Sequence, residues 1–464
     1  AAIGALTYFL QSWSLPAVII LFFGLNFLYS KEIIDPRNKA YGLKYTNIKL
    51  RPDYNKQSLQ NLCTPSKIET DKKNMISILN KWKQKQQEDK PIMVFINVSG
   101  GGLRSAVFTM NSLQKTDSLC NGNLMKKTFL ITGASGGMLA ATYYRELYNK
   151  KVDNTDFDLY NNRFTENIAK DILNPVFTSL MARDVLAPAQ KFSIGNNRYI
   201  KDRGYAFEKK ANENCEGELT KQLKDLKADE HSAKVPLIIF NSTIKSDARK
   251  MMISTQPISF MMKPFAQQND KTASPDAVDF GALFINQNPQ DLRLLTAMRM
   301  NATFPYVLPN VWLPTNPVID VMDAGLRDNF GQETALRFVD NFKDWIAENT
   351  GGVLFIQIRD RPTDNWQQPF ETKSVTDMIV TPATMLQHNY FKIQEIYQTD
   401  QFNYLSTNTA FKMYKQTIMY VSQNEEKGAA LNFHLSAGEK KDVINAYNNK
   451  QNQQAVKNII SLIK

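Results

Sequence analysis

The sequence predicts an α/β protein with a mainly parallel central sheet sandwiched by helices, preceded by an N-terminal transmembrane helical segment. Two observations predict this architecture. Short apolar runs rich in β-branched residues alternate with helix-like segments along the chain, a pattern typical of parallel strands buried on both faces. The first 30 residues also carry no charge, whereas the rest of the 464-residue chain is ordinary in its apolar and charged fractions.

The uncharged segment is the first element. Residues 1–30 read AAIGALTYFLQSWSLPAVIILFFGLNFLYS. A helix of about 20 apolar residues spans a bilayer core, so we expect a transmembrane segment, which could be the end of a longer membrane region; a buried core helix is the alternative. Basic residues outnumber acidic ones after Ser30, and the positive-inside rule then places the following domain in the cytoplasm.

The remaining chain divides by its patterning. Residues 31–90 read as a basic linker followed by a helix at 71–88, and residues 91–464 read as the main domain, with insertions at about 151–233 and 245–290. Strands are expected at Ile92–Val98, Thr128–Thr132, Val235–Asn241, Val318–Val321, Val353–Ile358 and Thr417–Val421. Helices are expected from Leu103, at Gly136–Asn149, at 332–347 and at the C-terminus.

The net charge bears on the kind of partner that the chain binds, and the cysteine content bears on disulfide and zinc sites. The net charge of +11 favours contact with an anionic surface, either nucleic acid or membrane, although a solvated basic surface would give the same count. Because no nucleic-acid-binding motif is present, a nucleic-acid binder is the weaker interpretation. The three cysteines (Cys63, Cys120 and Cys215) are widely spaced, which argues against a disulfide framework and a zinc site.

A serine between glycines follows the second predicted strand. The stretch ITGASGG places Ser135 at the junction of a strand and a helix. A sharp turn of this kind needs small neighbours and exposes the hydroxyl at a helix N-terminus, where developing negative charge is favoured. Ser135 is therefore a candidate nucleophile.

A second glycine cluster, VSGGGLRSA, follows the first predicted strand. Its glycines, Gly100, Gly101 and Gly102, leave backbone amides free to face one point, as an oxyanion hole requires. The sequence matches neither the P-loop nor the dinucleotide fingerprint. A tight turn without function is the alternative.

The base for Ser135 is expected from Asp323. None of the three histidines lies in a recognisable motif, whereas Asp323 in DAG follows a short apolar run. A carboxylate at a strand end can share a crevice with the serine and act as its general base. A serine–aspartate dyad needs no histidine.

In this order, SGGGLR, GASGG and DAG resemble the patatin-like and cytosolic phospholipase A2 superfamily, and the segment RMNATFPYVLP supports the resemblance, which covers about residues 91–330. The resemblance implies that Ser135 is the nucleophile, Asp323 its partner, and Gly100, Gly101 and Gly102 the oxyanion loop. It also implies that Arg104 binds the lipid phosphate or braces that loop. The sequence departs from plant patatins at Ser105 and in having DAG instead of DGG or DGA, which bears on lipid preference.

The resemblance implies a serine lipid acyl hydrolase of the phospholipase A or lysophospholipase type, with no cofactor and no metal, and the uncharged N-terminal segment adds the expectation that it is membrane-anchored. Its partners would be membrane phospholipid and the bilayer, and a membrane protein partner or a second copy stays open. An acyltransferase with the same dyad and a non-catalytic membrane-complex subunit that keeps the fold are the alternatives. Methionines and phenylalanines between residues 251 and 265 either line a channel for acyl chains or pack in the core.

Overall fold

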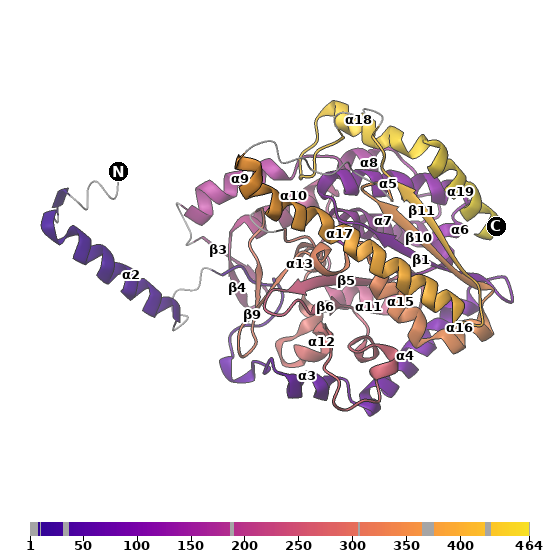
Figure 1. Cartoon of the computed structure of the whole chain (residues 1–464), viewed down its shortest axis with the longest axis horizontal. Coiled ribbons are helices and arrows are strands. Elements are labelled where there is room, and N and C mark those ends of the chain that lie inside the picture. Colours follow the sequence, from indigo (N-terminus) through magenta and orange to yellow (C-terminus); the bar gives the residue numbers. More distant parts are fainter. Residues whose placement is uncertain are drawn as a thin grey trace. The chain divides into compact units, whose positions relative to one another are not determined.

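The computed structural model describes residues 8–9, 11–30, 37–185, 190–304, 307–363, 375–422 and 428–463, and at 29–30, 184–185 and 375–388 it describes the backbone alone. The chain forms two compact units, Ala1–Asn38 and Lys39–Lys464 (Figure 1). Each unit is described by itself.

The first unit contains one apolar helix. A 3₁₀ turn at Gln11–Trp13 leads into α2, Ser14–Ser30. Among the described residues, one helix is long and apolar enough to cross a membrane, and it corresponds to Gln11–Leu28. Its large side chains are exposed, with Phe22 at 67 %. This length and composition fit a membrane anchor or a signal sequence; residues 1–7 of the expected segment lie outside the described residues.

The second unit is organised around a mostly parallel sheet. In the described residues this sheet has nine strands in the order β11-β10-β1-β2-β5-β6-β7, with β9 paired to β5 and β8 to β9. The five strands from β11 to β5 are parallel, and β6 and β9 run antiparallel to β5. The strands are β1 (Ile92–Val98), β2 (Thr128–Gly133), β5 (Leu237–Ile244), β6 (Lys250–Ile253), β7 (Ala277–Asp279), β8 (Val311–Leu313), β9 (Ile319–Met322), β10 (Gly352–Arg359) and β11 (Met413–Met419).

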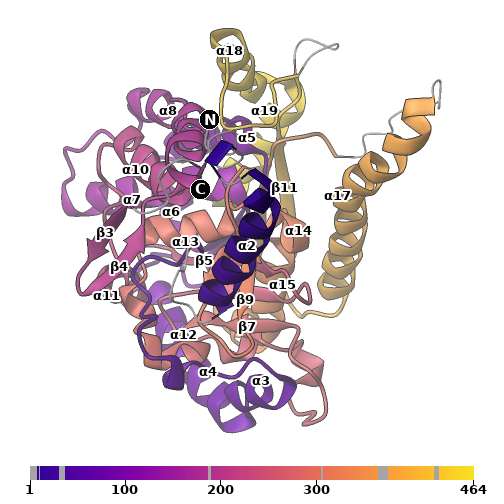
Figure 2. The same cartoon turned by 90° about the vertical axis from the view of Figure 1, so that its left-hand side faces the viewer.

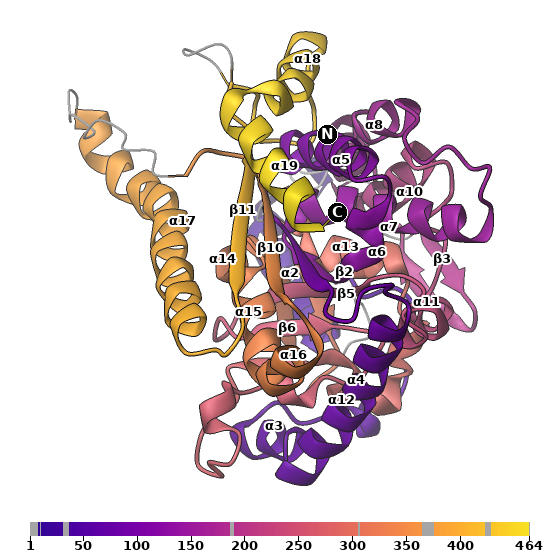
Figure 3. The same cartoon turned by 90° about the vertical axis from the view of Figure 1, so that its right-hand side faces the viewer.

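Helices cover both faces of the sheet (Figure 3). Along β1, Val94 and Ile96 pack into a cluster with α5, α7 and α19, whereas Met93 and Phe95 pack into a second cluster with α4, α15 and α16. This alternation is the period-two pattern of a strand buried on both faces. The helices named here are α4 (Pro65–Gln84), α5 (Gly102–Leu119), α7 (Ser135–Asp153), α13 (Leu294–Asn301), α14 (Gly325–Asp328), α15 (Gln332–Asn341), α16 (Lys343–Asn349), α17 (Val375–Thr407) and α19 (Lys450–Ile463).

The expected insertions hold further elements. The first contains the helices α8 (Arg163–Ile168), α9 (Leu173–Ser179), α10 (Arg203–Asn214) and α11 (Leu223–His231) and a separate hairpin of β3 (Lys191–Ile194) and β4 (Asn197–Ile200). The second supplies β6 and β7 to the main sheet, together with the short helix α12 (Phe280–Leu283). Three short helices remain: α3 (Lys56–Leu62), α6 (Asn123–Lys127) and α18 (Ala437–Asn445).

The expected strands are all present, with ends that shift by a few residues. The expected helix at 332–347 is divided at Phe342, where the backbone leaves helical geometry between α15 and α16. The methionine-rich segment packs in the core: Met251, Met252, Met261 and Met262 are all fully buried. None of these methionines lines the cavity at Ser135 described below, so core packing explains this segment.

Candidate active site

Ser135 occupies a strained turn at the end of β2. Its φ of 52° lies in the left-handed region, which costs a residue with a side chain about 1–3 kcal/mol. Asn301 at the end of α13 holds the turn: its Oδ1 accepts from the Ser135 amide at 2.7 Å and its Nδ2 donates to the Gly133 carbonyl at 2.9 Å. The backbone carbonyl of Asn301 also accepts from the Ala324 amide at 3.0 Å, so one residue ties the serine turn to the Asp323 loop.

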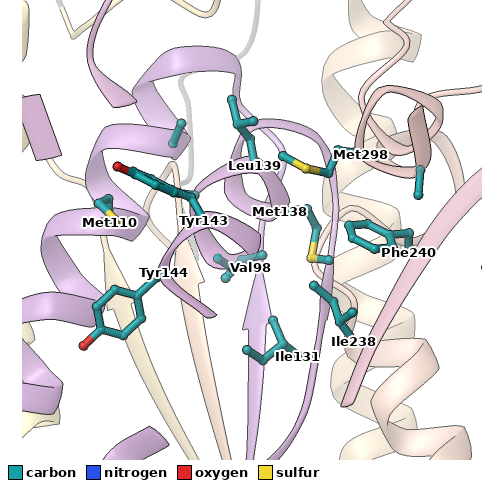
Figure 4. Close-up of a cluster of buried hydrophobic side chains, with 14 of the residues drawn as sticks. Val98, Met110, Ile131, Met138, Leu139, Tyr143, Tyr144, Ile238, Phe240 and Met298 are labelled. Carbon is teal, nitrogen blue, oxygen red and sulfur yellow. The ribbon is translucent and has the colours of Figure 1, made fainter. Parts of the chain in front are cut away.

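The helix that follows Ser135 is firmly seated. Figure 4 shows Met138 and Leu139 of α7 among the core side chains around Val98, Ile131 and Ile238, and all five residues are buried. Close packing of this kind fixes the N-terminus of α7 against the sheet. The serine turn is therefore held at its base as well as by Asn301.

The glycine loop lies directly against the serine turn. Val98 of β1 lies opposite Gly133 of β2, so the two strands end together. A Cβ on Gly136 would lie 1.8 Å from the Gly102 carbonyl oxygen, which no side chain could tolerate. The glycine after Ser135 is thus required for the two loops to meet.

The amides of the glycine loop differ in their availability. The Gly100 amide donates to the Asn329 carbonyl at 3.1 Å. The amide of Leu103, which follows the three glycines, donates to the Asn432 carbonyl at 2.7 Å. Within the part of the chain that the structure describes, the amides of Gly101 and Gly102 donate to no acceptor. These two N–H groups are therefore available to a ligand.

Asp323 directly follows β9 and is 3 % exposed. Its Oδ1 accepts from the Gly325 amide at 2.7 Å, while its buried Oδ2 has no hydrogen-bond partner among the described residues. Burial raises the pKa of Asp323 to about 6, and the Gly325 amide and the Ser135 hydroxyl partly oppose that rise. A carboxyl group with this pKa is suited to exchanging protons near neutral pH.

The side chains of Ser135 and Asp323 lie close to each other, but no hydrogen bond of ordinary geometry joins them. Both side chains line one cavity, and the Ser135 hydroxyl is near enough to lower the pKa of Asp323. The free Oδ2 leaves the carboxylate able to accept a proton. A direct Asp323–Ser135 hydrogen bond stays a prediction, since such contacts are often loose without substrate.

Asn329 is a site residue that the sequence did not single out. It is 2 % exposed, and its Nδ2 has no acceptor among the described residues. A Cβ on Gly100 would lie 2.6 Å from Asn329 Oδ1 and 3.5 Å from Ser135 Cβ, so the carboxamide and the serine lie on the same side of the glycine loop. A buried amide without an acceptor costs about 1–3 kcal/mol, which a ligand oxygen in the cavity would offset.

Arg104 lies behind the glycine loop. Both Arg104 and Arg361 bond to the carboxylate of Asp360. Arg104 Nη2 donates to Asp360 Oδ2 at 2.6 Å, and Arg361 Nε donates to Asp360 Oδ1 at 3.0 Å. Burial alone would raise the pKa of Asp360, but the two guanidinium groups hold it below its usual range. A Cβ on Gly101 would lie 2.6 Å from Asp360 Cβ, so this cluster of two cations and one anion braces the loop from behind.

The cavity at Ser135 has a volume of about 120 Å³. Its lining is mostly glycine and apolar, and Arg361 is the sole cation among the described residues that form it; Arg104 is not part of the lining. Three larger hollows, of about 530, 710 and 690 Å³, are lined by none of the predicted site residues. The residues around the small cavity are Gly100, Gly101, Gly102, Ser135, Leu173, Phe304, Val307, Asp323, Gly325, Leu326, Asn329, Arg361, Phe391, Leu431, Asn432 and Phe433.

The histidines with described side chains bond to partners other than Ser135. His231 contacts Lys81 at 3.0 Å, and His434 contacts Asp171 at 3.0 Å. The side chain of His388 lies outside the described residues.

Comparison with protein families gives one match that spans more than half of the chain. Residues 97–336 match the family described as Patatin-like phospholipase. The chain belongs to the patatin-like phospholipase family. The mixed, mostly parallel sheet flanked by helices agrees with the patatin fold, and lipid hydrolysis is the activity that membership of the family supports.

Solved structures show more distant likenesses. VipD from Legionella pneumophila has 12 % sequence identity and a TM-score of 0.32, with 80 % of this chain and 67 % of that chain covered. Human GIVD cytosolic phospholipase A2 has 12 % identity and a TM-score of 0.33, with 63 % and 50 % covered. The same human enzyme in complex with methyl gamma-linolenyl fluorophosphonate has 12 % identity and a TM-score of 0.39, with 86 % and 63 % covered. The chain thus spans between half and about two thirds of the length of these proteins, and a search of curated proteins found no match.

Proposed function

We propose that the chain is a membrane-anchored serine lipid acyl hydrolase that uses a Ser135–Asp323 dyad and an acyl-serine intermediate. One observation carries the proposal: a serine in a left-handed turn, a buried carboxylate and two backbone amides line the same cavity, and one carboxylate oxygen and both amides have no partner among the described residues. This set contains a nucleophile, a base and anion donors.

The proposed reaction uses these groups as follows. Asp323 accepts the proton of the Ser135 hydroxyl as Oγ attacks the ester carbonyl carbon, and the carbonyl oxygen becomes an oxyanion. When the intermediate collapses, the C–O bond to the lipid alcohol breaks and the leaving oxygen takes the proton from Asp323. Water then attacks the acyl-Ser135 ester, gives its proton to Asp323, and Ser135 recovers a proton as the fatty acid leaves.

The oxyanion donors are assigned from the hydrogen bonds. Because the Gly100 amide is engaged by Asn329, we assign the oxyanion to the amides of Gly101 and Gly102, and Gly100 then fixes the loop. The unpaired Nδ2 of Asn329 is a further donor on the same side of the loop. One donor of this kind contributes about 10²–10³ in rate.

Headgroup recognition is assigned to Arg361. Its guanidinium lines the cavity, whereas Arg104 donates to Asp360 and, at 2.7 Å, to the Ala429 carbonyl. Two arginines share the single charge of Asp360, so the cluster keeps a net positive charge close to the cavity. We therefore propose that Arg361 contacts the phosphate of a phospholipid or lysophospholipid and that Arg104 braces the glycine loop.

The rest of the chain fits attachment to a membrane. We propose that residues 1–30 anchor the protein, that the basic stretch after Ser30 connects this anchor to the second unit, and that the second unit, Lys39–Lys464, works at the cytoplasmic surface. The uncharged α2 and the net charge of +11 support this arrangement.

The test is hydrolysis of defined lipids by the purified full chain. Mixed phospholipids are incubated with wild type and Ser135→Ala, and the products are identified by mass spectrometry. We expect free fatty acid from wild type and a loss of several orders of magnitude in Ser135→Ala. Near wild-type release by Ser135→Ala would refute the nucleophile. Acyl transfer to an added lipid alcohol without free fatty acid would indicate the acyltransferase, and no acyl product at all would indicate a non-catalytic subunit.

A further inference from the structure

On the outward side of the described part of α17, large apolar side chains are exposed, and the acidic Asp400 interrupts them between Tyr397 and Tyr404. We call these side chains the outer face of α17: Tyr390, Ile393, Ile396, Tyr397 and Tyr404, with exposed fractions of 39, 48, 60, 65 and 72 %. These positions repeat at helical spacing and form one stripe. Figure 2 shows α17 along the margin of the second unit.

Between residues 389 and 400 of the same helix, the two buried side chains are both glutamines, whereas Leu405 further along packs in the core. Gln394 Oε1 accepts from the Asn329 amide at 2.8 Å and its Nε2 donates to the Gly325 carbonyl at 2.9 Å. One turn further on, Gln398 Nε2 donates to Asp328 Oδ1 at 2.9 Å. Both glutamines are less than 10 % exposed. The helix from residue 389 to 400 is therefore inverted relative to an ordinary surface helix, which buries its apolar side and exposes its polar side.

The apolar stripe is continuous with the substrate cavity. Phe391, on the same turn of α17 as Tyr390, lines the cavity at Ser135. Tyr390 donates its hydroxyl proton to the carbonyl of Leu326, which also lines it. Leu431 lines the cavity as well and is 52 % exposed. Apolar surface thus extends from the mouth of the cavity onto the outer face.

The size of the cavity explains why this surface would be useful. The cavity at Ser135, of about 120 Å³, is smaller than the three other hollows described above. We expect the reacting ester to enter it while much of a long acyl chain stays outside the mouth. In water that chain would be exposed, whereas in a bilayer it would stay in an apolar surrounding.

We propose that the outer face of α17 docks on the surface of a lipid bilayer and so presents the mouth of the Ser135 cavity to membrane lipid. The proposal rests on the proposed function for its substrate. Tyrosine and isoleucine side chains suit the boundary between headgroups and acyl chains. The net charge of +11 belongs to the whole chain and favours approach to an anionic leaflet, whereas α17 itself presents the acidic Asp400, so its contact with lipid rests on the apolar side chains.

The first test measures contact with lipid directly. In the inactive Ser135→Ala full chain, Ile396→Cys carries an environment-sensitive fluorophore. Ile285→Cys is the matched control, because Ile285 is 69 % exposed but is not on α17. The native cysteines are buried, which favours labelling at the introduced thiol. The protein is reconstituted into vesicles of phosphatidylcholine and phosphatidylserine, with or without brominated phosphatidylcholine.

We expect brominated lipid to quench the label at position 396 at least about threefold more than the label at 285. Equal quenching at the two positions would overturn the proposal. If the fluorescence at position 396 is unchanged by brominated lipid but changes with protein density, a second copy of the chain covers the outer face of α17. That result would also overturn the proposal.

The second test separates docking from chemistry. The double variant Ile396→Ser, Tyr397→Ser should lower hydrolysis of vesicle phospholipid by about tenfold or more, since each lost apolar side chain removes burial in the bilayer. Hydrolysis of a water-soluble short-chain ester should change less than about twofold, and Ile285→Ser should change neither. Equal losses on both substrates would indicate damaged packing and overturn the proposal. If wild type hydrolyses neither substrate but position 396 is quenched by lipid, the proposed function fails and docking stands.

Discussion

Asp323 gives the sharpest prediction, because the same burial that suits it for proton transfer should weaken the fold. We expect Asp323→Asn to abolish hydrolysis and to stabilise the protein at neutral and alkaline pH. The carboxyl group is 3 % exposed, its Oδ2 has no partner among the described residues, and burial raises its pKa from 3.8 to about 6. Asparagine keeps the shape but carries no charge to bury.

The magnitude follows from the pKa shift. A rise of about two units corresponds to about 3 kcal/mol at about 1.4 kcal/mol per unit. Since the folded pKa is raised, the ionised form is disfavoured by folding. Below about pH 4 the carboxyl group is protonated in both states and costs nothing; the cost grows between about pH 4 and 6 and is complete above about pH 6. Asp323→Asn should therefore gain up to about 3 kcal/mol at pH 8 and almost nothing at pH 4.

The assay is unfolding of the full chain by urea in one detergent at both pH values, with Asp276→Asn as the control. Burial would raise the pKa of Asp276, but Arg337 holds it below its usual range, at 2.7 Å. Stability from this pair is present above the unfolded pKa and is lost in acid, so Asp276→Asn should destabilise at pH 8. A stabilisation by Asp323→Asn that is equal at pH 4 and pH 8, or a destabilisation at pH 8, would refute the reasoning.

The pH dependence of the reaction gives a further prediction. The value of kcat/KM should fall by about tenfold per pH unit below about pH 6, because protonated Asp323 cannot accept the serine proton. A kcat/KM that stays flat down to about pH 5 would exclude Asp323 as the base. Arg361→Gln should lower kcat/KM for phospholipid by about tenfold or more while changing hydrolysis of a neutral acylglycerol with the same chains less than about threefold. Arg104→Gln should affect both substrates alike. A loss selective for phospholipid in Arg104→Gln, with both substrates affected alike in Arg361→Gln, would assign headgroup binding to Arg104. Asn329→Leu should lower kcat by about 10²–10³ with little change in KM, and an unchanged kcat in steady-state assays would remove it from the oxyanion site. His231→Gln should cost no more than about tenfold, and a larger loss would point to a histidine base.

The sequence predicted the parts of this site that depend on local chemistry. Ser135 and the glycine loop were found because a buried strand followed by clustered glycines indicates a sharp turn, and the structure places both at the ends of adjacent parallel strands. Asp323 was found because a carboxylate at a strand end can share that edge, and it lines the same cavity as Ser135. Each of these signals lies within a few consecutive residues.

Asn301, Asn329 and Arg361 could not be found in the same way. Asn301 was quoted within a motif, but its bonds to Ser135, Gly133, Asn241 and Ala324 join segments more than 20 residues away from it, which no local pattern encodes. Asn329 matters because its Nδ2 lacks an acceptor, a property that exists only once the chain is folded. Arg361 and Arg104 both bond to Asp360, but Arg361 lines the cavity and Arg104 does not, so a choice between the two arginines needed their contacts.

Helix α17 shows why periodicity alone can mislead about orientation. Its spaced isoleucines and tyrosines would ordinarily be assigned to the core side, because periodicity gives the existence of an apolar face but not what covers it. The tertiary contacts decide the matter: glutamines on the opposite side find backbone partners in the loop after Asp323.

The same glutamine connects the outer face of α17 to the proposed chemistry. Gln394 bonds the Asn329 amide and the Gly325 carbonyl, while the Gly325 amide holds Asp323 Oδ1 and the Asn329 carbonyl holds the Gly100 amide. The Gln394 side chain therefore bonds both to the residue that holds the base and to the residue that holds the glycine loop. Each such bond contributes about 1 kcal/mol net, so the position of α17 is coupled to both the base and the glycine loop.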